Sequence, residues 1–190
     1  MRLAMKPYAV NGVLAGSLAG KRAFADLVSR TIVPSQPEVC FLDFRGIEVM
    51  TASFARDGVV AYRNHARSLW PTVFPVAANT AWNVREELAT WLDEVGDGFV
   101  VCDLDGAGRP SNATLVGRLD GKQLVALKGV IELGETDAAT LAQHIGESVA
   151  PTAWNNRLSA LVTKGFLIEV PTGSRIKRYR PVLEGLRYGA

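Results

Sequence analysis

The chain of 190 residues is long enough for one large domain or two small ones. With 48% hydrophobic and 21% charged residues it is close to the globular average, which excludes a disordered chain and predicts a buried core. The net charge of +2 is small, but residues 1–112 hold 11 basic and 12 acidic side chains, whereas residues 113–190 hold 10 and 7. This distribution is a mild indication of an anionic partner for the second part.

Membrane and secretory classes are disfavoured by the hydropathy pattern. No apolar run approaches the roughly 18 residues that a membrane span needs. The apolar stretch after Lys6 is interrupted by Asn11 and by glycines, which argues against a signal peptide. We therefore expect a cytoplasmic protein without membrane contact. Cys40 and Cys102 each lie in an apolar run, as buried reduced thiols usually do, although a disulfide between them stays open.

The first part of the chain alternates between strand and helix patterns. Amphipathic stretches predict helices near 18–32, 53–69 and 80–96, and apolar runs predict strands over 39–44, 73–79 and 99–106, with a further strand within 7–15. Pro75 indicates an edge or irregular position for the second of these apolar strands. The alternation predicts an α/β domain over residues 1–110 whose sheet is covered on at least one face.

The helix expected over 80–96 has the clearest pattern in this part. Its cap is expected to be Asn79 or Thr80, and it ends at Gly96. One face is expected to be lined by Trp82, Leu88, Trp91, Leu92 and Val95.

The segment AGRPSN, residues 107–112, is rich in turn-forming residues and is the best candidate for a domain boundary. Beyond it, the patterns predict helices over 120–133 and 135–146, the second capped by Thr136 or Asp137. A four-residue turn then leads to a helix from Pro151 to about Gly165. The runs FLIEV and IKRYRPV, joined by PTGS, predict a β-hairpin. A second, mainly helical domain is thus expected over 113–190.

This order of elements resembles a winged helix-turn-helix. TLAQHIG resembles the second helix of that superfamily, and TAWNNRLSALVTKGFLIEV is similar to a recognition helix followed by the first strand of the wing. The resemblance covers about residues 120–183 and implies a DNA-binding fold. Trp154 and Tyr179 are expected in the core or in packing of the wing, and His144 at the surface.

The helical periodicity independently places polar groups on the outer face of the 151–164 helix. With Trp154, Leu158, Leu161 and Val162 on the buried side, the 100° step puts Thr152, Asn156, Ser159 and Thr163 on the far face, with Asn155 and Arg157 on its flanks. In this motif the front of the helix enters the major groove, where Asn can contact adenine and Arg can contact guanine or phosphate. The expected contacts to double-stranded DNA are Thr152, Asn155, Asn156, Arg157 and Ser159 from the helix, with Arg175, Lys177 and Arg178 from the hairpin.

The same residues allow a different interpretation. Asparagines on a helix surface are usually only solvated, and winged helices also serve as protein-binding modules. The basic hairpin is the stronger indication, because four cations within residues 175–180 exceed what solubility requires. A winged helix that reads a palindrome normally binds as a dimer, so a homodimer is an expectation, although no dimerisation helix is evident.

The segment CFLDFRGIEVMTASFARDGVVAY in the first part is similar to the STAS fold of anti-sigma-factor antagonists. The residues that carry the similarity are Asp43, Phe44, Gly46, Ile47, Thr51, Ser53, Phe54 and Ala55. The resemblance covers about residues 8–106 and implies a partner with the histidine-kinase-like ATPase fold. Thr51 and Phe54 depart from the antagonist pattern, which has Asp and Gly at these positions.

Alignment with the STAS pattern makes Ser53 the candidate phosphorylation site. A serine at a helix N-terminus is favourably placed to carry an anionic group, because free N–H groups and the helix dipole stabilise it. Serine is also a preferred N-cap, and a structural cap is the simpler role for Ser53.

Enzyme chemistry has little support in the sequence. There are only two histidines, no glycine-rich phosphate loop and no metal-ligand spacing, so we expect no catalytic residues, no metal and no cofactor. Asp103 and Asp105 could bind a cation or act as acid and base, but the Asp-Gly sequence favours a turn.

The sequence therefore predicts a bacterial transcription regulator with a STAS-like α/β domain followed by a mainly α winged-helix domain with a β-hairpin wing. The alternative is an adaptor in a partner-switching pathway that meets an ATPase or kinase and does not bind DNA. A hydrolase or nucleotide enzyme is the weakest of these three hypotheses.

Overall fold

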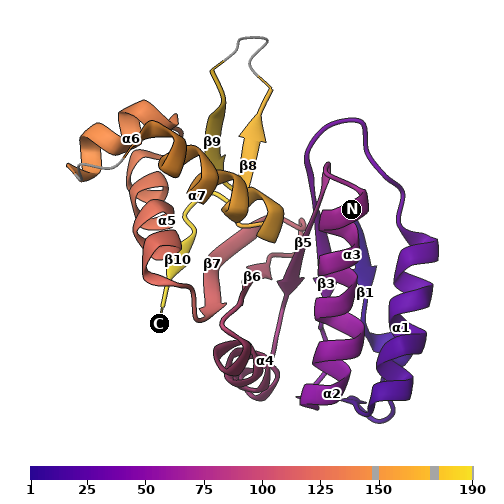
Figure 1. Ribbon diagram of the computed structural model, residues 1–190. Helices are drawn as coiled ribbons and strands as arrows, with labels where there is room; N and C mark the ends of the chain where they lie inside the picture. The colour runs from indigo at the N-terminus through magenta and orange to yellow at the C-terminus, as the bar shows by residue number, and fades with distance from the viewer. Residues whose placement is uncertain (147–149, 172–175, 190) are drawn as a thin grey trace.

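The computed structural model describes residues 1–146, 150–171 and 176–189, which form an α/β fold around a mixed sheet (Figure 1). The sheet has six strands in the order β1-β3-β5-β6-β7-β10, in which β6 and β7 are antiparallel and the other neighbours are parallel. The strands are β1 (Arg2–Ala4), β3 (Glu38–Asp43), β5 (Val73–Ala78), β6 (Gly98–Leu104), β7 (Pro110–Gly117) and β10 (Arg187–Tyr188).

Helices of the first half connect the parallel strands. A short helix η1 (Lys6–Tyr8) and a two-stranded sheet of β2 (Val13–Leu14) and β4 (Val49–Met50) accompany them. The helices are α1 (Ser17–Arg30), the continuous run of α2 (Ala52–Phe54), η2 (Ala55–Val60) and α3 (Ala61–Leu69), and α4 (Trp82–Val95). The run from 52 to 69 is helical as expected, with a π-helical segment at η2. The expected strand within 7–15 is reduced to the two residues of β2.

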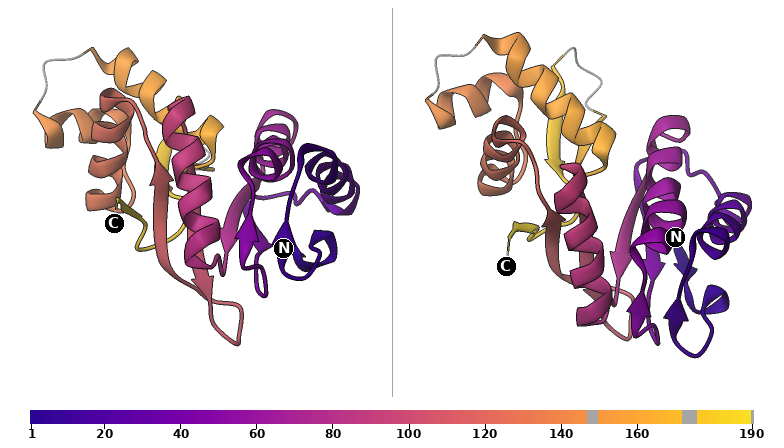
Figure 2. Two further views of the ribbon diagram at one scale, coloured as in Figure 1. Left: turned by 90° about the horizontal axis from the view of Figure 1, so that it is seen from below. Right: turned by 60° about the horizontal axis from the view of Figure 1, so that its bottom comes forward.

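The second half contains three helices and an antiparallel hairpin. They are α5 (Gly121–Leu133), α6 (Ala138–Ile145), α7 (Pro151–Lys164), β8 (Leu167–Val170) and β9 (Arg178–Pro181). Asp120 caps α5 and Asp137 caps α6, the latter being one of the two expected caps, and Gly146 and Gly165 end α6 and α7 in the left-handed conformation. The hairpin stands beside α7, and α1 and α3 lie side by side, with α3 also contacting α7 (Figures 1 and 2).

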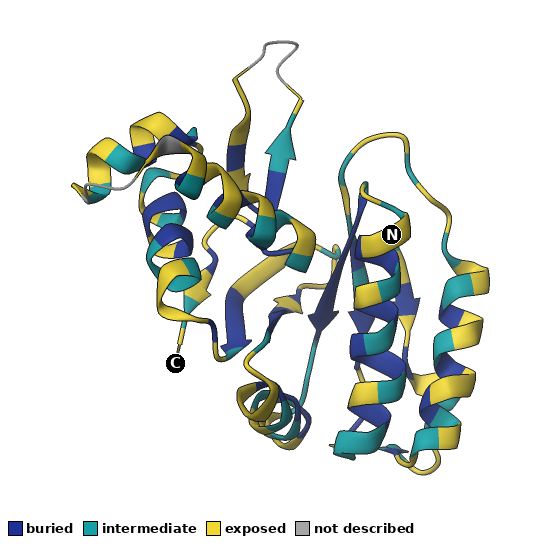
Figure 3. Cartoon of the chain, in the orientation of Figure 1, coloured by how far each residue is buried: buried dark blue, intermediate teal, exposed yellow. Residues whose placement is uncertain are grey.

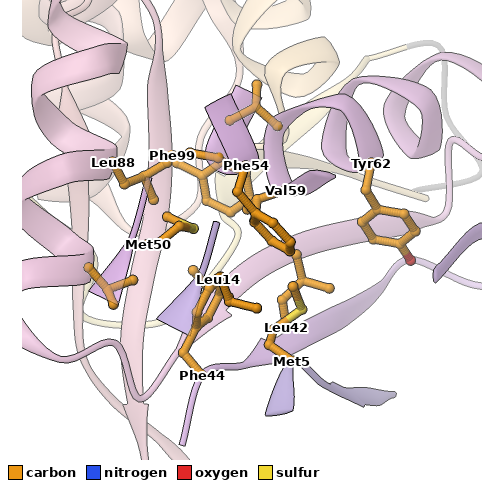
Figure 4. Packing of buried hydrophobic residues seen from close by; sticks show 14 of the residues in the cluster. Met5, Leu14, Leu42, Phe44, Met50, Phe54, Val59, Tyr62, Leu88 and Phe99 are labelled. Carbon is orange, nitrogen blue, oxygen red and sulfur yellow. The ribbon is translucent and has the colours of Figure 1, made fainter. Parts of the chain in front are cut away.

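Alternate residues of the central strands enter two different hydrophobic clusters. Val73 and Ala77 of β5 pack with the helices of the first half, and Figure 4 shows part of this cluster, including Phe54, Leu88 and Phe99. Phe74 and Val76 of the same strand pack instead with α5, α6, α7 and the hairpin. The second half therefore covers the face of the sheet that α1, α3 and α4 leave open.

The segment 107–112, expected to be a boundary, includes the turn between β6 and β7 and the start of β7. Asp105 organises this turn by accepting the N–H groups of Ala107 and Arg109, both at 2.9 Å, as the Asp-Gly sequence indicated. Strands β7 and β10, which no clear residue pattern indicated, come from beyond this turn and complete the sheet of the first half. The sheet is thus built from both of the expected domains, and their separate functions stay predictions.

The edge position expected for Pro75 is found locally: β5 is an interior strand, but Pro75 pairs only with Cys40 of β3, because β6 pairs with β5 only from Ala77 onward. The expected cap of α4 is wrong. Ala81, rather than Asn79 or Thr80, precedes α4, and it makes no side-chain cap.

The apolar face of α4 is also narrower than expected. Its buried stripe is Val84, Leu88 and Leu92 at intervals of four residues. Trp82 is 71% exposed because it precedes this stripe by two residues and points away from the sheet, and Val95 is 52% exposed at the end of the helix.

A close crossing of two glycines fixes α1 against the π-helical segment. A methyl group on Gly58 would lie 3.2 Å from both the Cα and the carbonyl oxygen of Gly20, with backbone on both sides. We expect Gly58→Ala to lower the free energy of unfolding by about 1–3 kcal/mol, as overpacking does. Urea denaturation measures the change. Gly121→Ala, where no atom lies within 4 Å, is the control, and an equal loss in both variants would contradict this account.

Candidate nucleic-acid interface and the polar edge of the sheet

The front of α7 and the residues that lead from the hairpin turn into β9 share one groove. Its volume is about 500 Å³, and it is lined by Asp137, Ala138, Ala139, Asn155, Ser159, Ile176 and Lys177. Asn155, Ser159 and Lys177 thereby bring an amide, a hydroxyl and an ammonium group from two elements to the same concave surface. These groups can donate and accept hydrogen bonds and attract an anion.

The helix presents its polar side outward because its apolar side is used in the core. Trp154, Leu158 and Leu161 are fully buried, as the periodicity predicted. Thr152, Asn156, Ser159 and Thr163 are exposed, as is Asn155 on the flank. Exposed residues recur along α7 in Figure 3. The predicted far face of Thr152, Asn156, Ser159 and Thr163 is confirmed.

Arg157 is half-buried and belongs to the flank of α7. Its guanidinium carbon lies 4.4 Å from the centroid of the Trp154 ring, a cation–π geometry. The ring of Trp154 is therefore a packing surface for Arg157 and is not open to a stacked base. Tyr179 is likewise buried in the core, as expected.

The cations of the hairpin are divided between its two faces. Successive residues of a strand point to opposite sides, so Lys177 faces the groove on the same side as Tyr179, and Arg178 faces the other side. Lys177 Nζ lies 2.9 Å from Glu169, and Arg178 Nε lies 3.0 Å from Glu135. The sequence pattern did not indicate this division. Arg175 and most of the residues expected to form turns, at 147–150 and 171–174, lie outside the described residues.

The charge in the groove is mixed. The hydrogen bond to Glu169 raises the pKa of Lys177, which keeps the ammonium group charged. Asp137 is held ionised as the cap of α6, because the Thr140 backbone N–H, followed by its hydroxyl and the Ala139 N–H, lowers the carboxyl pKa despite partial burial. His144, expected at the surface, lies there with its Nε2 2.9 Å from Glu132.

Ser53 does not cap the helix that it enters. Thr51 is the cap, and its Oγ1 accepts the Phe54 N–H at 3.4 Å and the Gly16 N–H at 3.1 Å. The Ser53 hydroxyl lies 3.2 Å from that oxygen. The Ala52 N–H donates to the Glu87 carboxylate at 2.9 Å, so an acidic group from α4 already occupies the positive end of this helix. The structural-cap role expected for Ser53 therefore belongs to Thr51.

A second polar cluster lies at the carboxyl ends of the parallel strands. Asp43 is 5% exposed and accepts hydrogen bonds from Arg2 Nε at 2.9 Å, Asn79 Nδ2 at 2.6 Å and the Arg45 N–H at 3.2 Å. The Asn79 side-chain oxygen in turn accepts the Leu104 N–H at 2.9 Å. These hydrogen bonds link the ends of β3, β5 and β6 to one another. The residue pattern did not indicate this stabilising role, although Asp and Asn occur at the ends of apolar runs there.

Asn79 adopts the left-handed conformation with φ of 56°, which asparagine tolerates better than most residues. This backbone turn aims its side chain back across the strand ends instead of toward α4, which explains why it does not cap that helix. Within the described residues no group of three or more His, Cys, Asp or Glu side chains could hold a metal ion. No helix in the described part is both long and apolar enough to cross a bilayer.

Comparison with known proteins gives no relative from which a role could be transferred: no family model, curated protein or solved structure matches this chain. A function is therefore inferred from the groove, the sheet edge and the sequence resemblances.

The hydrogen bonds to the Asp43 carboxylate predict that the stability of the protein depends on pH. Burial opposes ionisation of Asp43, but the hydrogen bonds from Asn79 and Arg2 outweigh it and hold the carboxyl pKa below its ordinary value. Because the folded state has the lower pKa, the stabilisation is present above about pH 4 and is lost as the pH falls through the folded pKa.

We expect Asp43→Asn to lower the free energy of unfolding by about 1–3 kcal/mol at pH 7. The difference from the wild type should shrink as the pH falls below about 4, because the Asp43 carboxyl of the unfolded wild type then becomes protonated, which favours unfolding; the folded carboxyl is protonated only at a lower pH. Chemical denaturation between pH 7 and pH 3 measures it, with Asp93→Asn on the exposed side of α4 as the control. A difference in unfolding free energy that stays constant over this pH range would contradict stabilisation by the ionised Asp43 carboxylate.

Proposed function

We propose that this protein is a bacterial transcription regulator that binds double-stranded DNA through α7 and the β8–β9 hairpin. The observation that carries the proposal is the shared groove, in which Asn155 and Ser159 of the helix and Lys177 of the hairpin line one surface. A groove-reading helix needs such an arrangement, with polar side chains at its front and a cation beside it for the phosphate backbone.

The order of the elements supports a winged helix-turn-helix. After α5, Thr136 forms an antiparallel bridge with Tyr179 of β9, and α6, α7, β8 and β9 follow in sequence. This isolated bridge ties the segment between the first two helices to the edge of the hairpin. The order of three helices followed by a hairpin agrees with the resemblance found in the sequence.

The chemistry of the exposed side chains suits a duplex. Asn155 and Asn156 can each make two hydrogen bonds to the edge of an adenine, and Thr152 and Ser159 can bond to a base or a phosphate. Lys177 and Arg178 would contact phosphates on the two sides of the hairpin. Their carboxylate partners Glu169 and Glu135 are partly exposed, and such surface pairs contribute only about 0–1 kcal/mol, so a phosphate can replace the carboxylate.

The first half is proposed to be a STAS-like regulatory domain that docks a protein partner, with Ser53 as the position where a kinase would act. Ser53 is half-exposed at the start of the 52–69 helical run. A phosphate on it would compete with Glu87 for the helix N-terminus and add up to two negative charges. This proposal includes no catalytic activity and no cofactor, and a homodimer would suit a palindromic operator.

One observation favours the alternative of an adaptor that binds only proteins. Trp82 is 71% exposed at the start of α4, the same helix whose Glu87 contacts the start of α2. Large exposed aromatic side chains are frequent anchors of protein interfaces. In the adaptor reading, an ATPase or kinase would bind around this end of α4, and duplex DNA would have no affinity for α7.

Salt-dependent binding to a mixed-sequence duplex separates the two functions. The logarithm of the binding constant falls linearly with the logarithm of the salt concentration, because binding releases counterions. The slope is about −0.9 for each phosphate contact. Replacement of Lys177 by Ala should therefore weaken binding at low salt and reduce this slope by about 1. Fluorescence anisotropy of a labelled duplex at several salt concentrations measures both quantities.

Lys21→Ala is the matched control, because Lys21 is an exposed lysine on α1, far along the chain from the groove. It removes the same charge and should leave the slope unchanged. Absence of duplex affinity in the wild type at low salt would reject the DNA-binding function in favour of the adaptor.

A further inference from the structure

Two buried arginines join the first half of the molecule to the carbonyl end of α7. Arg63 and Arg67 lie one turn apart on α3, and their exposed fractions are 2% and 8%. Arg63 Nη1 donates to the Lys164 carbonyl at 3.3 Å, and Arg67 Nη2 donates to the Val162 carbonyl at 3.0 Å. The last turn of a helix carries a partial negative charge and carbonyls without α-helical partners, and both cations interact favourably with it; the Val162 carbonyl also accepts the Gly165 N–H.

The same guanidinium groups are fixed within the first half. Arg63 Nη1 also donates to the Gly98 carbonyl at 2.9 Å, and its Nη2 forms an ion pair with Asp97. Arg67 Nη1 donates to the carbonyls of Pro71 and Val73 at 2.9 and 2.7 Å. Because each arginine binds the sheet side and α7 at once, each bridges the two halves.

Ionic and packing contacts complete the junction. Lys164 Nζ lies 3.1 Å from Asp97, so this carboxylate is shared between α3 and the end of α7. The Arg67 guanidinium lies over Phe74 at 3.8 Å from the ring centroid. A methyl group on Gly165 would lie 3.3 Å from Arg67 Cδ, which shows how closely the end of α7 approaches this side chain.

We propose that Arg63 and Arg67 are positioning residues that fix the orientation of α7 for DNA binding, so that the first half determines how the polar front of this helix meets the groove of a duplex. The inference rests on the proposed DNA-binding function. Neither arginine is available to DNA, because both are buried at the end of α7 opposite to Thr152 and Asn155.

Lysine in place of Arg67 tests this role. It keeps the charge but cannot donate to Pro71, Val73 and Val162 together, as the planar guanidinium does. We expect the affinity for a mixed-sequence duplex to fall about five- to tenfold, with an unchanged dependence on salt because no phosphate contact is lost. Arg22→Lys, at an exposed position of α1, is the matched control and should have no effect.

Amide hydrogen exchange gives a measurement that does not depend on DNA. The Gly165 N–H donates to Val162 and the Phe166 N–H to Leu161, both at 2.9 Å, directly beside the arginine contacts. In Arg67→Lys these two amides should exchange at least about tenfold faster, because the neighbouring charged hydrogen bond is lost. The Gly20 amide of α1, bonded to Gly16 at 3.0 Å, should be unchanged.

The possible results distinguish the two proposals. If the wild type does not bind a duplex but the Gly165 and Phe166 amides accelerate selectively, the DNA-binding function fails and the junction stands. If DNA binds and Arg67→Lys behaves as the wild type in affinity and in amide exchange, the positioning role is rejected. A lower salt slope in Arg67→Lys would mean a direct phosphate contact and would also reject it, as would equal acceleration at Gly20.

A second variant covers the case in which Arg67→Lys does not fold. Lys164→Gln removes the ion pair to Asp97 from the partly exposed side of the same junction, where the lysine side chain is 27% exposed. A smaller acceleration at Gly165 and a smaller loss of affinity are expected, again with an unchanged salt slope. Wild-type behaviour in both measurements would count against the junction.

Discussion

The structure depends on the burial of both faces of the central sheet. Side chains alternate along β5 and β6, so one face packs against α1, α3 and α4, and the other against the helices and hairpin of the second half. β7 and β10 extend this sheet with residues from beyond the turn at 105–109. Neither half therefore has a complete sheet of its own, which ties the α7 groove to the strands of the first half.

The placement of the candidate groove follows from this packing. Trp154, Leu158 and Leu161 secure one side of α7 to the core, which leaves the amides and hydroxyls of its front outside. Arg63 and Arg67 secure its far end. Since α3 continues from the helical run that begins beside Ser53, a partner acting there would act on the element that carries both arginines. In the proposed regulator, this helical run links the start of α2, where a partner would dock, with α7, which would bind DNA.

Sequence periodicity predicted most helices and the central strands, because burial of one side leaves a direct trace in the residue pattern. It located the exposed polar residues of α7 for the same reason. It failed where long-range partners decide the outcome. Ala81, rather than Asn79 or Thr80, precedes α4, and Thr51 caps α2 in place of Ser53. The separation of Lys177 from Arg178 and the bridging by Arg63 and Arg67 require tertiary contacts that no local pattern encodes.

The central claim is that α7 and the hairpin form the surface that meets DNA. Backbone amide NMR of the full chain during titration with a mixed-sequence duplex tests it most directly. The account predicts that chemical-shift changes concentrate at residues 152–159 and 176–178, with little change along α1. Changes confined to the start of α2 and α4, or no changes at low salt, would contradict it.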